Sequence, residues 1–94
     1  MSDKEVLEKA SKAERLLADP LLTESFDAIR MAILDKIEAA PVRDRDGVHE
    51  LKLMLKLLRD VRGNLEQAVR DGKFVTLRTR SEDEEKKRRF FNFR

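Results

Sequence analysis

The chain has 94 residues, of which 43 % are charged and 5 % are aromatic, and its net charge at pH 7 is only +2. The absence of cysteine excludes disulfides, thiolate metal sites and a thiol nucleophile, and no stretch reaches the roughly 18 consecutive apolar residues that a membrane span needs. Residues 72–94 carry 8 Lys and Arg against 4 Asp and Glu, so an anionic partner is expected to be recognised by this basic end.

Two helices are predicted in the first 40 residues. The first begins at a capping Ser2 or Asp3 and ends near Ala18. The second runs from about Pro20 to Ala39, because proline is favoured at the first position of a helix behind a capping aspartate. The apolar residues of the second helix recur at helical spacing and are Leu22, Phe26, Ile29, Ile33 and Ile37.

A longer third helix is predicted to begin after Asp44 or Asp46 and to reach about Arg70. The connection before it, residues 41–47, is short and polar, which favours an antiparallel arrangement of the second and third helices. Gly72 is expected to end the third helix in the left-handed cap conformation. Gly63 lies inside this helix and has two interpretations, a tolerated surface glycine or a close crossing of two helices.

The third predicted helix is apolar on two sides. Its main apolar stripe is formed by Leu51, Met54, Leu58, Val61, Leu65 and Ala68. At about 100° per residue, Leu53 and Leu57 lie about 200° and 240° from Leu51, nearly on the opposite side. A helix that is apolar on two sides must be covered twice, and a chain of this length has few elements to provide the cover. We therefore predict self-association, as a homodimer or a larger ring, through Leu51, Leu53, Met54, Leu57, Leu58, Val61 and Leu65.

The sequence changes character after Gly72. Residues 74–79 are β-branched, aromatic or alternating, which predicts an extended arm, and Ser81 with Glu84 fits a capping box that predicts a short terminal helix. The expected protein is therefore all-α. It has a short N-terminal helix, an antiparallel helical hairpin, an extended arm and a short terminal helix, divided into a helical domain (1–73) and a basic-aromatic arm (74–94).

The C-terminal arm is the predicted partner-binding segment. Aromatic residues beside arginine are typical of interface hot spots, so we expect this tail either to dock on another protein or to fold back on the helices of its own chain. The residues expected to bind a partner are Phe74, Leu77, Arg78, Arg88, Arg89, Phe90, Phe91, Phe93 and Arg94.

No set of residues points to catalysis. His49 is the single histidine and, without cysteine, it has no companion for a metal site or a catalytic triad. The three glycines are scattered, so no phosphate-binding loop is predicted. We expect a non-catalytic protein with no cofactor. The polar N-terminus is unlike a signal peptide and favours a location inside the cell, with no membrane partner.

Two other functions remain open. The basic tail and its phenylalanines suit the binding of DNA or RNA through phosphate contacts and base stacking. Against this, four acidic residues in the tail would repel phosphate, and no basic face is expected on the rest of the chain. Lys52 and Lys56 are interpreted as solvated side chains at the rim of the interface. The other alternative is a small inhibitor or antitoxin-like binder that threads its tail into a target enzyme.

Several short motifs lie between residues 13 and 73. They are AERLLADPL at 13–21, Phe26-Asp27, PVRDRDG at 41–47, LMLKLL at 53–58, Leu65-Glu66 and Asp71-Gly72-Lys73. Together they resemble small helical proteins encoded among tailed-bacteriophage structural genes. The resemblance implies a structural role, as a virion component, adaptor or assembly protein, whose partner would be another phage structural protein. It implies no catalytic residues.

Overall fold

A computed structural model describes the backbone of residues 1–92 and the side chains of residues 1–89. It contains three helices, α1 (Asp3–Ala18), α2 (Pro20–Ala39) and α3 (Arg45–Asn92), and no strand among the described residues. The all-helical prediction is confirmed, as are the ends of the first two helices. The molecule is elongated, at 77 × 26 × 19 Å, because α3 alone has 48 residues.

The first two helices begin as their capping residues predict. The Ser2 hydroxyl accepts a hydrogen bond from the backbone N–H of Glu5 at 3.2 Å, and the Asp19 carboxylate accepts one from the N–H of Leu21 at 2.9 Å. Asp19 is extended and stands between the two helices, and Pro20 opens α2. A single residue thus ends α1 and starts α2, so the chain changes direction sharply there.

Helix α3 is capped by Asp44. Its carboxylate accepts a hydrogen bond from the N–H of Gly47 at 3.0 Å, and its carbonyl accepts one from the N–H of Val48 at 3.1 Å. A Cβ on Gly47 would come within 2.3 Å of the Asp44 carboxylate, so the glycine leaves room for the cap. The predicted start of the third helix after Asp44 is confirmed.

Removing this cap is expected to destabilise the protein modestly. Asp44→Ala should lower the free energy of unfolding by about 1 kcal/mol, because it leaves helical N–H groups without an acceptor. Arg43→Ala, a change of a neighbouring loop residue outside the cap, is the control. Urea denaturation followed by circular dichroism at one protein concentration measures both. Equal unfolding midpoints would show that the cap contributes nothing.

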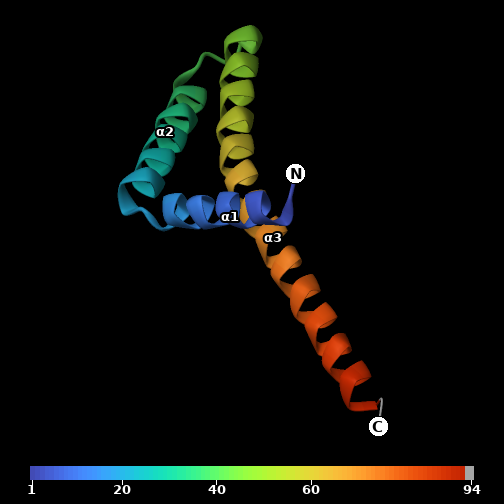
Figure 1. The fold of residues 1–94 in the computed structure, drawn as a ribbon. Coiled ribbons are helices and arrows are strands. Elements are labelled where there is room, and N and C mark those ends of the chain that lie inside the picture. Colours follow the sequence, from blue (N-terminus) through green and yellow to red (C-terminus); the bar gives the residue numbers. More distant parts are fainter. Residues whose placement is uncertain (93–94) are drawn as a thin grey trace.

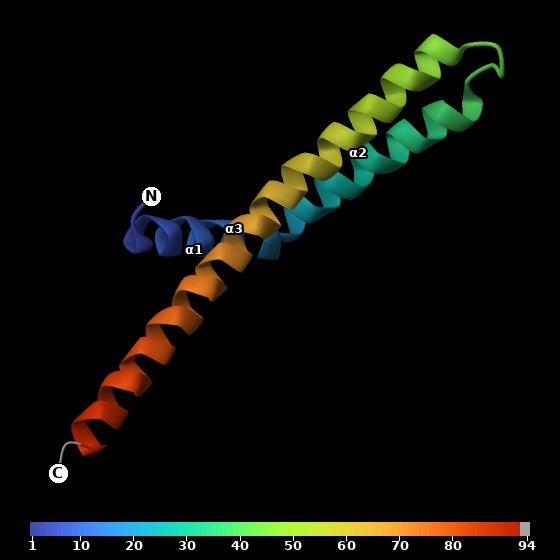
Figure 2. The same cartoon turned by 90° about the vertical axis from the view of Figure 1, so that its right-hand side faces the viewer.

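The three helices form an open triangle with one extended side. In Figure 1, α2 and the first part of α3 run in opposite directions on either side of the loop 40–44 and diverge toward the start of α2. Helix α1 spans the open end and crosses α3 near its middle. Figure 2 shows that the second half of α3 projects beyond this crossing without another helix beside it.

The α1–α3 crossing is built from small side chains. Ala10 and Ala13 of α1 and Ala68 and Val75 of α3 are buried, and a Cβ on Gly72 would lie 2.3 Å from the Cβ of Ala10. These residues let the two helices approach closely, and glycine is required at position 72 because Ala10 lies directly against it. The buried residue that α2 contributes is Ile33.

The predicted C-terminal cap at Gly72 and the extended arm after it are wrong. Helix α3 passes through both, and no described residue has a positive φ. Val75 is buried, and the Thr76 hydroxyl donates a hydrogen bond to the Gly72 carbonyl at 3.0 Å. Extending a helix needs no new nucleus, and a β-branched residue in a helix costs less than about 1 kcal/mol, so the local preference for a strand is overcome.

The short terminal helix is also part of α3. Ser81 lies inside the helix rather than at its start, and the i, i+4 pair between Glu85 and Arg89 has an N–O distance of 3.0 Å. The four acidic residues at 82–85 each precede a basic residue by four positions, the order that favours helix. Side chains 79–89 are all exposed, so this segment is held by local pairs rather than by packing.

Candidate protein-interaction surfaces

An apolar surface on α3 lies open to solvent. Leu53, Met54, Leu57 and Val61 are between 48 and 64 % exposed, although they lie in the first half of α3, the half beside which α2 runs. At about 100° per residue these four side chains span a sector of about 100°. They therefore form one surface rather than scattered apolar residues.

This surface points in the direction from which α1 packs on α3. Met54 and Leu57 each lie 18 residues, about five helical turns, before Gly72 and Val75 respectively. Residues five turns apart point the same way along a straight helix. The sector that α1 buries around Gly72 and Val75 is thus continuous with the sector left uncovered around Met54 and Leu57.

Helix α2 adds Ile29 to the same side. Asp27 and Arg30 both lie to one side of Phe26 around α2. On that side α2 forms a groove with α3, which contributes Lys52 and Arg59. Ile29 lies about 60° from Phe26 in the opposite sense, hence on the side of Met54 and Val61, and it is 50 % exposed. We call the set Ile29, Leu53, Met54, Leu57 and Val61 the apolar face.

The other three residues predicted at the oligomer interface are half-buried within the chain itself. Leu58 lines the groove between α2 and α3 together with Phe26. Leu65 lies beside Ala13 of α1, and Leu51 is half-buried on the side of α3 that faces α2. The structure therefore divides the predicted set, and only part of it belongs to the apolar face.

The predicted partner-binding residues lie along the second half of α3. Phe74 and Leu77 are 65 and 63 % exposed, and the side chain of Arg88 is also exposed. Phe90 and Phe91 fall in the last helical turn, where only the backbone is described. Phe93 and Arg94 lie outside the described residues.

Arg78 ties the second half of α3 to the start of the chain. Its guanidinium donates a hydrogen bond to the carboxylate of Asp3, in the first turn of α1. This hydrogen bond, reinforced by the negative charge of Asp3, raises the pKa of Arg78. Both side chains are about half exposed, so the pair orients α1 on α3 and adds little to stability.

The charges on α3 are segregated, which corrects the expectation of a body without a basic face. Between residues 45 and 73, every Lys and Arg falls within a sector of about 120°. Four of the five acidic residues, at positions 46, 50, 60 and 71, lie outside it. The cations of this basic sector are Arg45, Lys52, Lys56, Arg59, Arg62, Arg70 and Lys73.

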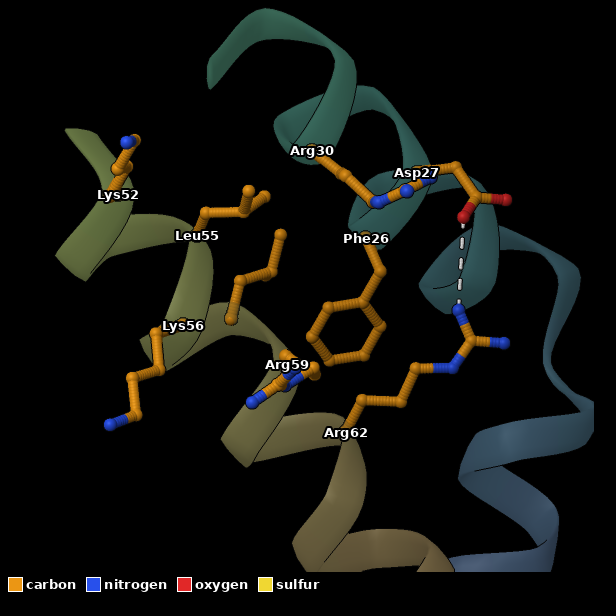
Figure 3. Close-up of a pocket in the computed structure, with 9 residues that line it drawn as sticks. Phe26, Asp27, Arg30, Lys52, Leu55, Lys56, Arg59 and Arg62 are labelled. Atoms are coloured by element: carbon orange, nitrogen blue, oxygen red, sulfur yellow. Dashed lines mark ion pairs between the residues drawn. The ribbon is translucent and has the colours of Figure 1, made fainter. Parts of the chain in front are cut away.

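A groove of about 560 Å³ runs between α2 and the basic sector of α3. Figure 3 shows the Phe26 ring reaching from α2 toward α3, while Lys52 and Lys56 extend outward from the rim. Leu55 and Leu58 complete the apolar floor. The groove is lined by Phe26, Asp27, Arg30, Lys52, Leu55, Lys56, Leu58, Arg59 and Arg62, and we call it the basic groove.

Arg62 lies at one end of the basic groove and contacts acids on two helices. It is 3.7 Å from the Asp27 carboxylate of α2 and 3.5 Å from the Glu66 carboxylate one turn further along α3. The dashed line in Figure 3 marks the pair with Asp27. These partners offset the charge of Arg62, whereas no described acidic side chain forms an ion pair with Lys52, Lys56 or Arg59.

The described residues contain no cluster of His, Asp and Glu suited to hold a metal ion. None of the helices in this part of the chain is both long and apolar enough to cross a membrane. The chain matches no protein-family model, no curated protein and no solved structure.

Sequence reasoning missed Ile29 as part of a surface, and it missed the basic groove. The apolar pattern of the helix alone places Lys52 and Lys56 at the rim of an interface and does not show that they belong to a basic groove. Following the positions of Lys and Arg around the same helix would have placed Arg59 and Arg70 beside them. The contribution of α2 to the groove depends on how the helices pack, which helical spacing does not contain.

Proposed function

We propose that this protein is a non-catalytic structural or assembly protein that self-associates through the apolar face and presents its long C-terminal helix to a partner protein. The α2–α3 hairpin is the associating unit in this proposal. The projecting part of α3, residues 78–92, extends away from that unit and is available for a partner.

One observation carries the proposal. The apolar face is the uncovered continuation of a surface that α1 buries further along α3, around Gly72 and Val75. Apolar side chains gathered on one surface favour removal from water in proportion to their area. A second copy of the chain offers the same surface, so a symmetric contact covers both apolar faces at once.

The resemblance to small helical proteins of tailed-bacteriophage structural genes supports placing this assembly role in a virion, as a component or an adaptor. The shape of the protein fits such a role. A helical body with a projecting helix provides two separate attachment points, one for further copies and one for a different protein. Neither attachment requires a pocket with converging catalytic groups.

The two attachment points are expected to be separable. Deleting residues 81–94 should leave the number of chains in the oligomer and the helix content per residue unchanged, because the described side chains after Arg80 contact no other helix. Light scattering and circular dichroism measure these two quantities. The same deletion should abolish binding to any partner protein that is found to co-purify with the full chain.

Two results would contradict this division. A deletion variant that becomes monomeric would place self-association in the tail rather than on the apolar face. A deletion variant that loses helix content throughout would show that the tail belongs to the folded core. Arg88→Ala with Arg89→Ala in the full chain is the milder companion variant, and it should weaken partner binding while leaving the oligomer intact.

A further inference from the structure

We propose that the basic groove binds an acidic amphipathic helix of a partner protein, which would pack as a third helix against α2 and α3. This proposal rests on the proposed function of a protein-binding assembly protein and names the chemistry of one partner. The apolar face plays no part in it, because that face lies on the opposite side of the α2–α3 pair.

The floor and the rim of the groove define the ligand. Phe26 and Leu58 are half-buried and form an apolar strip between the two helices, which suits apolar side chains repeated along one face of a helix. The exposed cations Lys52, Lys56 and Arg59 border this strip on the α3 side. A ligand that covers the apolar floor and pairs with the cations of the rim has an apolar stripe with acidic side chains beside it.

The surface continues beyond the groove in the same direction. Phe74 and Leu77 lie 18 residues after Lys56 and Arg59, about five turns, so each pair points the same way. Both apolar side chains are more than 60 % exposed, and Arg70 and Lys73 lie between them and the groove. From Lys52 to Leu77 this surface is about 38 Å long at 1.5 Å per residue, the length of a helix of about 25 residues.

A protein helix fits this surface better than a nucleic acid does. A phosphate backbone would be attracted by the cations but has no apolar side to cover the floor. Stacking of successive bases needs several exposed aromatic rings, whereas Phe26 in the groove is half-buried and Phe74 is the single aromatic residue of α3 on this surface.

The test uses the full chain and a designed peptide of about 25 residues, with leucine at heptad positions a and d and glutamate at e and g. Binding is measured by fluorescence anisotropy in low salt, and the amide resonances of the protein map the contact. The same peptide with lysine in place of glutamate is the ligand control. A duplex DNA of about 20 base pairs is measured in parallel.

Lys52→Glu with Arg59→Glu should weaken binding of the acidic peptide by about ten-fold or more, because like charges then face each other across the interface. Lys4→Glu with Lys36→Glu carries the same change in net charge at exposed sites outside the groove and should leave the affinity within about two-fold.

The resonances that shift on binding should include those of Phe26 and Leu55. Phe74→Ser should weaken binding of the full-length acidic peptide. It should not change the affinity of a shorter peptide that spans only the basic groove.

Three results would overturn the proposal. They are no binding of the acidic peptide at about 1 mM, equal affinity for both charge-reversed proteins, and DNA binding that is tighter than peptide binding and is lost on Lys52→Glu with Arg59→Glu. Light scattering of the same samples keeps the two proposals apart. A monomer that still binds the peptide in the groove contradicts self-association only, and an oligomer that binds no peptide contradicts the groove only.

Discussion

Replacing Gly72 with alanine is expected to destabilise the protein, whereas the same replacement at Gly63 is expected to stabilise it. A Cβ at position 72 would lie 2.3 Å from the Cβ of Ala10, an atom that moves only with its backbone, while a Cβ at position 63 meets nothing within 4 Å. Overpacking costs about 1–3 kcal/mol, and alanine in a helix returns about 1 kcal/mol relative to glycine. Gly72→Ala therefore loses stability on balance, and Gly63→Ala gains it.

The expected consequence for Gly72→Ala is that α1 loosens from α3. Urea denaturation at one protein concentration should give unfolding midpoints on opposite sides of the wild type for the two variants. Amide hydrogen exchange should be faster in α1 for Gly72→Ala only. The exchanged pair, Ala10→Gly with Gly72→Ala, restores the space at the crossing and should recover the slow exchange of α1. A Gly72→Ala protein as stable as Gly63→Ala would mean that the helices do not cross at this residue.

The second large effect is expected on the apolar face. Leu53→Glu with Leu57→Glu should convert the oligomer to a monomer of 11.0 kDa, because two carboxylates would have to leave water to enter the interface, at a cost of several kcal/mol. Both leucines are about half or more exposed in the single chain, so the helix content of the monomer should equal that of the wild type.

Met31→Glu is the matched control for this pair. Met31 is an apolar residue of α2 that is 53 % exposed, but it lies about 140° from Phe26 in the sense away from Ile29, outside the apolar face. The Met31→Glu protein should keep the oligomer mass of the wild type. A Leu53→Glu/Leu57→Glu protein with an unchanged mass would place the interface elsewhere, and loss of mass in all variants would indicate non-specific association.

The helix starts could be predicted from the sequence because they depend on local chemistry. Ser2, Asp19 and Asp44 each accept a hydrogen bond from an N–H group two or three residues ahead. This interaction depends only on residues that are close together in the sequence. The ends of α1 and α2 follow equally from Pro20 and from the loop residues after Ala39.

The end of α3 could not be predicted in the same way because local and long-range preferences disagree there. Residues 74–79 favour a strand and Gly72 favours a cap, but Leu65, Ala68, Gly72 and Val75 continue the spacing of three and four residues found earlier in the helix. That continuation indicates a longer helix. The helix continues through these residues because α1 packs on them. Where α1 crosses α3 depends on the fit between Ala10 and Gly72.

The candidate surfaces were predicted in part for a related reason. Exposed leucines on the second side of the third helix were expected, and Leu53 and Leu57 are exposed. The covered residues, Leu58 and Leu65, were not separated from them because helical spacing shows which residues share a side but not which neighbouring helix covers that side.

Sedimentation equilibrium of the wild-type chain over a wide range of concentrations tests the central claim most directly. With Met54, Leu57 and Val61 uncovered in the single chain, we predict a mass of at least two chains of 11.0 kDa, falling toward one chain only on dilution. A mass of one chain at the highest concentration would contradict self-association through the apolar face.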